Sequence, residues 1–121
     1  MIKCGIDLLR TSRLGDVNPA IRARFIRRVF TEAEIAQAQD DNDTLSGIFA
    51  AKEAVSKTLG TGIGKVAWQD IEILHAPSGE PGVTLHGVAL EVAQAKGLAE
   101  WAVSITHEGG MAAAVAVAQS A

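Results

Sequence analysis

The stretch that decides the fold is TLSGIFAAKEAVSKTL, residues 44–59, near the middle of the chain. It contains no proline, its apolar residues recur at helical spacing, and glycines follow it from Gly60, so it predicts one long helix. Projected at about 100° per residue, its apolar arc holds Leu45, Ile48, Ala51, Val55 and Leu59. We expect this arc to face the core.

Three charged residues of the predicted helix each allow two interpretations. Glu53 and Lys57 lie outside the apolar arc and four residues apart, so they could form an ordinary surface ion pair. They could equally be a carboxylate for a hard metal ion and an amine for phosphate. Lys52 lies inside the arc, where its stem could follow the apolar surface with the amine in water, or the amine could bind phosphate.

Residues 2–8 predict a half-buried strand, because apolar side chains alternate along them. The apolar face of this strand holds Ile2, Cys4, Ile6 and Leu8. Asp7 lies on the opposite face, where it would be solvated or, if the strand lies beside Glu53, would complete a metal site.

The rest of the chain predicts an α+β fold, with mostly antiparallel strands packed on the long central helix. Further helices are expected over residues 21–29, 32–39 and 88–96, and the second opens with a capping box of Thr31 and Glu34. Strands are expected over residues 66–74, 83–85, 101–107 and 111–118, the last two joined by a tight turn at Gly109–Gly110. The chain contains no repeat and no linker, so residues 1–121 are expected to form a single domain.

Composition excludes several classes of protein. A net charge of -3 argues against broad nucleic-acid binding, which needs a positive surface. Cys4 is the only cysteine, so no intrachain disulfide can form, and a reducing compartment is favoured. No apolar run approaches the roughly 20 residues of a membrane span, and the first residues do not resemble a signal peptide, so we expect a cytoplasmic protein without membrane association.

Local features leave further alternatives open. Five arginines gather near the N-terminus and form either a solvated helix face or a docking surface for an acidic protein: Arg13, Arg22, Arg24, Arg27 and Arg28. Gly60, Gly62 and Gly64 either stop the helix or offer backbone N–H groups to phosphate, although they do not form a Walker loop. His107 ends a predicted strand, as a structural residue or one that contacts phosphate or transfers a proton.

Five motifs occur in an order that is similar to one known family. They are Gly5-Ile6-Asp7 with Arg13, FAAKEAVSK at 49–57, GTGIG at 60–64, QDIEI at 69–73 and SITH at 104–107. The sequence thereby resembles the holo-[acyl-carrier-protein] synthases, the small bacterial 4′-phosphopantetheinyl transferases. The motif at 49–57 is the most specific, and the matches span nearly the whole chain.

This resemblance implies a 4′-phosphopantetheinyl transferase fold and an enzyme of fatty-acid biosynthesis. Members transfer the phosphopantetheine arm of coenzyme A to a serine of apo-acyl carrier protein, release adenosine 3′,5′-bisphosphate, require Mg²⁺ and form homotrimers with sites between subunits. The resemblance implies that Asp7 and Glu53 bind the metal and that Glu53, Lys57 and His107 carry the catalysis. For coenzyme A the expected residues are Lys52, Lys57, Gly60, Gly62 and His107, and for the carrier protein they are Arg13, Arg24 and Arg28.

Two positions depart from the family pattern. Arg10 stands where members usually have a glutamate, and Ile48 stands where they usually have an arginine. These departures support an alternative, a relative that binds coenzyme A or the carrier protein without transferring the arm. A purely structural, oligomer-forming domain is a third interpretation. The general base also stays open between His107 and a water relayed through Glu53.

Overall fold

Two antiparallel sheets and one long helix organise the computed structural model, which describes all residues 1–121. The first half of the chain forms β1 (Ile2–Arg10), α1 (Ser12–Gly15), α2 (Pro19–Val29), α3 (Glu32–Ala38) and α4 (Asn42–Leu59). The second half forms the 3₁₀ helix η1 (Trp68–Asp70), β2 (Ile71–His75), β3 (Pro81–Leu85), α5 (Gly87–Ala95), β4 (Glu100–Glu108) and β5 (Met111–Gln119). The expected α+β class is confirmed.

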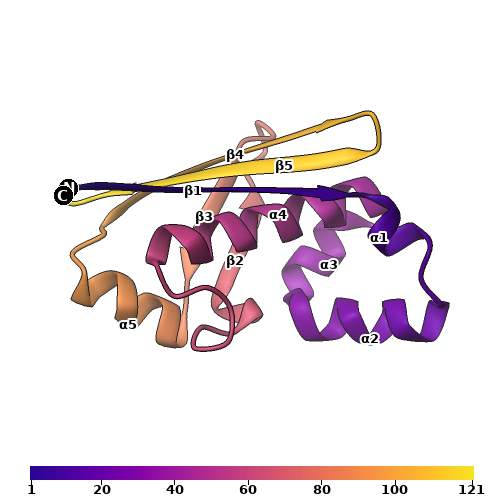
Figure 1. Cartoon of the computed structure of the whole chain (residues 1–121), viewed down its shortest axis with the longest axis horizontal. Coiled ribbons are helices and arrows are strands. Elements are labelled where there is room, and N and C mark those ends of the chain that lie inside the picture. The colour runs from indigo at the N-terminus through magenta and orange to yellow at the C-terminus, as the bar shows by residue number, and fades with distance from the viewer.

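The larger sheet has the strand order β1-β5-β4, so β1 and β4 are its two edges. Figure 1 shows α4 running beneath this sheet, the β2–β3 hairpin crossing behind the helix, and the two chain ends side by side. In register, Asp7 of β1 pairs with Ala114 of β5, which pairs in turn with Ile105 of β4. The β4–β5 connection is the expected tight turn, in which Gly109 and Gly110 both have positive φ.

The central helix begins two residues earlier than expected, because Asp41 is its N-cap and accepts a hydrogen bond from the Thr44 N–H at 2.8 Å. It ends at Gly60, whose φ of 81° is the left-handed conformation that glycine adopts easily. The predicted arc is buried, and Phe49, Ala50 and Ala54 are buried as well. The helix is therefore covered on most of its circumference.

The expected orientation of the first strand is wrong. Ile2, Ile6 and Leu8 are 68%, 66% and 63% exposed, whereas Leu9, on the other face, is buried. The face that meets α4 carries Gly5, Asp7 and Leu9, since the helix lies so close that only a small residue fits at position 5. The apolar alternation therefore marks a face that no part of a single chain covers.

Other elements agree with expectation except at their ends. The capping box of Thr31 and Glu34 is present at the start of α3. The strand expected over 66–74 is shorter, because the Asp70 carboxylate accepts from the Ala67 N–H and closes a turn of 3₁₀ helix before β2 begins. No helix has the length and the apolar character that crossing a membrane requires.

Candidate active site

Asp7 and Lys57 meet on the β1 side of α4. The Lys57 amine donates to the Ile6 carbonyl at 2.9 Å and lies 3.3 Å from an Asp7 carboxylate oxygen. The Asp7 side chain is only 17% exposed, while that of Lys57 is 50% exposed. The amine can therefore hold Asp7 in place and still reach a ligand from outside.

Gly5 allows this meeting because it is the point of closest approach between β1 and α4. A Cβ atom at position 5 would lie 2.3 Å from the Ala54 carbonyl oxygen, 2.8 Å from Thr58 Oγ1 and 2.9 Å from Lys57 Cβ. Only glycine fits, since any Cβ would overlap the helix backbone. Asp7, two residues along on the same face, is thereby brought against the turn of α4 that carries Glu53 and Lys57.

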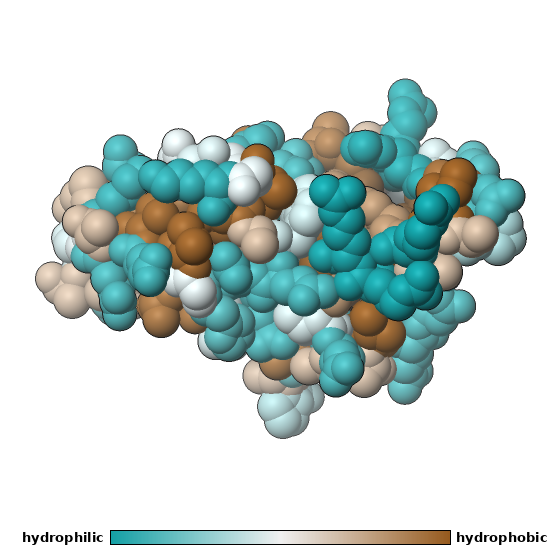
Figure 2. Space-filling view, turned by 90° about the horizontal axis from the view of Figure 1, so that it is seen from below, coloured by the Kyte–Doolittle hydropathy of each residue, from teal (hydrophilic) through white to brown (hydrophobic).

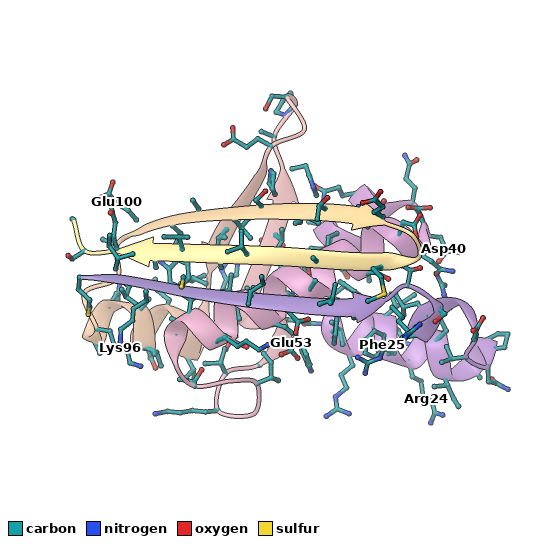
Figure 3. The ribbon with its side chains drawn as sticks, turned by 45° about the horizontal axis from the view of Figure 1, so that its top comes forward. Arg24, Phe25, Asp40, Glu53, Lys96 and Glu100 are labelled. Carbon is teal, nitrogen blue, oxygen red and sulfur yellow. The ribbon has the colours of Figure 1, made fainter.

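Glu53 is the second carboxylate of this site, and Figure 3 shows it on the β1 side of the helix. Its pKa is raised, chiefly by burial and then by the charge of Asp7, whereas Lys57 and Arg13 act in the opposite direction. The Ser56 hydroxyl donates to the backbone carbonyl of Glu53. The carboxylate of Glu53 itself has no hydrogen-bond partner. The site therefore holds two carboxylates close enough to repel, one of them unpaired.

These residues fit a magnesium ion. Mg²⁺ takes one or two protein carboxylates and completes its octahedron with water and phosphate oxygens. The chain has no cluster of three or more histidine, cysteine, aspartate or glutamate side chains that could hold a metal ion. An unpaired Glu53 beside Asp7, with the Lys57 amine next to them, suits a cation that arrives with a phosphorylated ligand.

The structure contradicts Lys52 as a coenzyme-binding residue. Its side chain is 0% exposed, and its amine lies 2.8 Å from the equally buried carboxylate of Glu34. The amine also donates to the carbonyls of Trp68 and Ile71, so all three of its hydrogens are used in the core. Neither an amine in water nor an amine on phosphate is possible here.

Sequence reasoning missed Glu34 as the partner of Lys52. Its carboxylate joins three elements, because it also accepts from the Thr31 N–H at the start of α3 and from the Ile73 N–H of β2, each at 2.8 Å. The one signal in the sequence is the position of Lys52 within an apolar arc, since a buried amine needs a charged or hydrogen-bonding partner. Nothing in the sequence could identify which acidic residue it was.

The glycine loop after α4 does not offer its N–H groups as expected. The Gly60 N–H donates to the carbonyls of Ser56 and Lys57, and the Gly62 N–H donates to Ser56. The Gly64 N–H is likewise bonded, to Val66. No atom lies within 4 Å of the position of a Cβ at Gly62 or Gly64, so the loop provides open space rather than free donors.

His107 lies apart from the carboxylates. It belongs to β4, the edge strand opposite β1, and its Nε2 atom lies 2.6 Å from the Asp43 carbonyl in the first turn of α4. Two strand spacings, about 10 Å, separate the edges of the sheet. A single chain therefore does not bring His107 to the site of Asp7 and Glu53.

The arginines of the N-terminal cluster differ in whether their side chains have partners within the chain. Arg22 is tied within the chain to Asp40, at 2.7 Å, and to Asn42, at 2.6 Å. Arg13, Arg24 and Arg28 are exposed, and no hydrogen bond or ion pair within the chain engages their side chains. Figure 2 shows hydrophilic side chains gathered over the half of the molecule that contains α2, where Figure 3 shows Arg24 pointing away from the protein.

A largely apolar cavity of about 360 Å³ includes Arg13 in its lining. Its lining comes from the end of β1 and from α1, α2 and α4, and it consists of Leu9, Arg13, Leu14, Val17, Ile21, Phe25 and Phe49. An arginine at the edge of an apolar cavity suits a partner that presents acidic and apolar groups together.

The positions that depart from the family pattern lie away from the carboxylates. Ile48 is fully buried in the core, and Arg10 is exposed on the outer face of β1. Neither takes part in the contacts among Asp7, Glu53 and Lys57.

Comparison with known proteins identifies the class. A family model described as "4'-phosphopantetheinyl transferase superfamily" matches residues 3–116. A holo-[acyl-carrier-protein] synthase of Natranaerobius thermophilus is 40% identical, with 97% of this chain and 96% of that protein covered. One of Moorella thermoacetica is 42% identical, with 99% and 95% covered.

Solved structures agree. The holo-[acyl-carrier-protein] synthase of Helicobacter pylori in complex with coenzyme A has a TM-score of 0.86 at 32% identity, covering 98% of this chain and all of the other. One from Bacillus anthracis, in complex with CoA (3',5'-ADP), has a TM-score of 0.80 at 30% identity, covering 98% and 96%. The chain belongs to the 4′-phosphopantetheinyl transferase superfamily and, within it, to the holo-[acyl-carrier-protein] synthases.

Proposed function

We propose that this protein is a Mg²⁺-dependent enzyme that transfers the 4′-phosphopantetheine arm of coenzyme A to a serine of an apo-acyl carrier protein of fatty-acid synthesis. The observation that carries the proposal is the group formed by Asp7, Glu53 and Lys57, two carboxylates and an amine brought together where β1 meets α4. We place the enzyme in the cytoplasm, since its single cysteine suits a reducing compartment.

The reaction needs charge neutralisation more than covalent help from the protein. The serine hydroxyl of the carrier protein gives its proton to the general base, which is His107 or a water relayed through Glu53. The serine oxygen forms a bond to the phosphorus that carries the pantetheine arm, and the bond from this phosphorus to the leaving adenosine 3′,5′-bisphosphate breaks. Asp7 and Glu53 would hold Mg²⁺, and the ion would supply positive charge to neutralise the pyrophosphate. The half-exposed Lys57 amine stabilises the negative charge of the leaving group.

Arg13, Arg24 and Arg28 receive the carrier protein. Their side chains are exposed and free of partners within the chain, and Arg13 lines the apolar cavity formed by the end of β1, α1, α2 and α4. Arginine forks would bind carboxylates of an acidic partner, while the cavity would accept an apolar side chain. This surface lies close to the metal-binding residues, since Arg13 influences the pKa of Glu53.

The active unit is a homotrimer. The outer face of the larger sheet is apolar and uncovered, with Ile2, Ile6, Leu8, Val115 and Val117 exposed. Such a face is typical of a surface that another subunit covers. In a closed ring each subunit presents one surface to the next, so His107 of one copy can complete the site of Asp7 and Glu53 of its neighbour.

Transfer is tested by mass spectrometry of the carrier protein. The protein is incubated with apo-acyl carrier protein, coenzyme A and Mg²⁺, and the intact mass of the carrier is followed. We expect the mass of one phosphopantetheine arm to be gained, and no gain when Mg²⁺ is chelated. If several carriers gain no arm while a known synthase modifies them, the proposed function is wrong and the non-transferring alternative takes its place.

A further inference from the structure

Gly47 lies beneath His107, where β4 crosses the first half of α4. A Cβ atom on Gly47 would lie 2.8 Å from Nε2 and 3.0 Å from Cε1 of the His107 ring, and 2.8 Å from Cγ2 of Ile105. Atoms of folded proteins do not pack a Cβ this closely, so a residue with a side chain here would move one or both neighbours. The absence of a side chain at position 47 thus lets the imidazole edge rest on the helix.

The hydrogen bond of His107 fixes which ring nitrogen carries hydrogen. Nε2 lies 2.6 Å from the carbonyl oxygen of Asp43. Because a carbonyl oxygen only accepts, Nε2 must carry the hydrogen and donate it. No other atom of this ring is hydrogen-bonded within the chain, so in the neutral ring Nδ1 is left as an unpaired acceptor.

We propose that Gly47 is a positioning residue for the transferase reaction, which acts by holding His107 on the Asp43 carbonyl so that Nδ1 faces the coenzyme and the carrier serine. The inference rests on the proposed function, since it assumes that His107 serves a site completed by a neighbouring subunit. It adds the roles of the two ring nitrogens: Nε2 anchors the side chain to α4, and Nδ1 makes the contact with substrate.

A different explanation of the glycine is packing against Ile105 alone, because Ile105 Cγ2 is as close to the Cβ position as Nε2 is. The two explanations predict different effects of Gly47→Ala once His107 is replaced. Asparagine at position 107 keeps a polar atom near the place of Nδ1 and lacks the Nε2–Cε1 edge that touches Gly47. Ile105 is unchanged in that background.

The test measures the rate of arm transfer for four proteins: the wild type, Gly47→Ala, His107→Asn and the double variant. We expect Gly47→Ala to lower kcat by about tenfold to a hundredfold in the wild-type background, as a misplaced catalytic group does. In the His107→Asn background the same substitution should change kcat by less than about twofold. An equal loss in both backgrounds would show that Gly47 acts through packing and would overturn the proposal.

Two further measurements keep the proposal testable in other cases. Gly47→Ala is used only if it keeps the elution volume and circular dichroism of the wild type. Otherwise His107→Asn, which keeps a polar atom near the place of Nδ1, is compared with His107→Gln, which keeps one near the place of Nε2. The proposal requires the Asn variant to be the more active. If the wild type itself transfers no arm, the proposed function has failed. The ring ¹⁵N shifts of His107 then report the positioning alone, with Nε2 protonated and Nδ1 bare in the wild type, and partial averaging of the two shifts expected in Gly47→Ala.

Discussion

At the scale of residues, the site depends on the carboxylate of Glu53, whose ionised form lowers the stability of the folded state. Burial and Asp7 raise the pKa of Glu53, so folding favours its protonated form. The contribution of Glu53 to stability is therefore most favourable below the pKa that this group has in the unfolded chain. That contribution is lost as pH rises through the pKa of Glu53 in the folded protein. At neutral pH an ionised Glu53 destabilises the fold and provides the charge that a metal ion needs.

Glu53→Gln should consequently separate activity from stability. We expect transfer to fall on the order of a hundredfold or more, because a charge-stabilising ligand is lost, while the Tm measured without Mg²⁺ rises. Glu91→Gln, an exposed carboxylate on α5, is the matched control and should change neither. A lower Tm, or transfer at the wild-type rate, would contradict the assignment.

The raised pKa also predicts the pH dependence. At subsaturating Mg²⁺, transfer by the wild type should decline as pH falls through the pKa of metal-free Glu53, which lies above that of an ordinary glutamate, because the protonated group competes with binding of the cation. The decline is measured from initial rates at saturating coenzyme A. A profile that stays flat down to the usual carboxylate range would show that Glu53 is not the ligand.

Unlike its neighbour Glu53, Lys52 stabilises the core, where its amine pairs with the Glu34 carboxylate. Lys52→Met should lower the free energy of unfolding by about 3–5 kcal/mol, since it leaves the buried charge of Glu34 without a partner. Adding Glu34→Gln should recover part of that loss, and folded protein of either variant should keep the wild-type KM for coenzyme A. Urea unfolding and initial rates measure both; a raised KM with unchanged stability would return Lys52 to the coenzyme site.

At the scale of elements, two glycines set where α4 crosses the larger sheet. Gly5 brings β1 against Ala54 and Thr58 in the second half of the helix, and Gly47 brings β4 against the first half. The helix therefore crosses the sheet obliquely and places Asp7 and His107 on opposite sides.

Gly5→Ala tests this crossing. The added methyl group overlaps the helix backbone, so we expect the free energy of unfolding to fall by about 1–3 kcal/mol and transfer to fall with it. Gly82→Ala in β3 is the control, because its Cβ would lie 3.7 Å from the nearest atom, an ordinary contact. Equal effects of both variants in denaturant unfolding would show that β1 has room to move.

Periodicity predicted most of these elements because each repeats a local pattern. The arc of α4, the capping box at Thr31 and the Gly109–Gly110 turn depend on residues close in sequence, and all three are confirmed. The pairing of Lys52 with Glu34 and the outward direction of the apolar face of β1 depend on contacts between residues distant in sequence. Alternation shows that a strand has two faces, but it cannot show which of them the chain itself covers.

At the scale of the whole molecule, the apolar outer sheet face is the feature that a single chain leaves unexplained. Ile6→Glu should dissociate the proposed trimer without unfolding the subunit, because the side chain is exposed in the single chain. Transfer should be lost along with the oligomer. Val88→Glu, at another exposed apolar residue on α5, should leave both the elution volume and the rate unchanged; an Ile6→Glu protein that stays trimeric would place the interface elsewhere.

The composite site is the central claim, and mixing two inactive proteins tests it most directly. Glu53→Gln and His107→Ala chains with different tags are co-expressed, and the mixed oligomers that carry both tags are purified. If Glu53 of one copy works with His107 of its neighbour, each mixed trimer contains one intact site in three and should regain roughly a third of wild-type transfer. Mixed oligomers that form but transfer no faster than the parent variants would contradict the account.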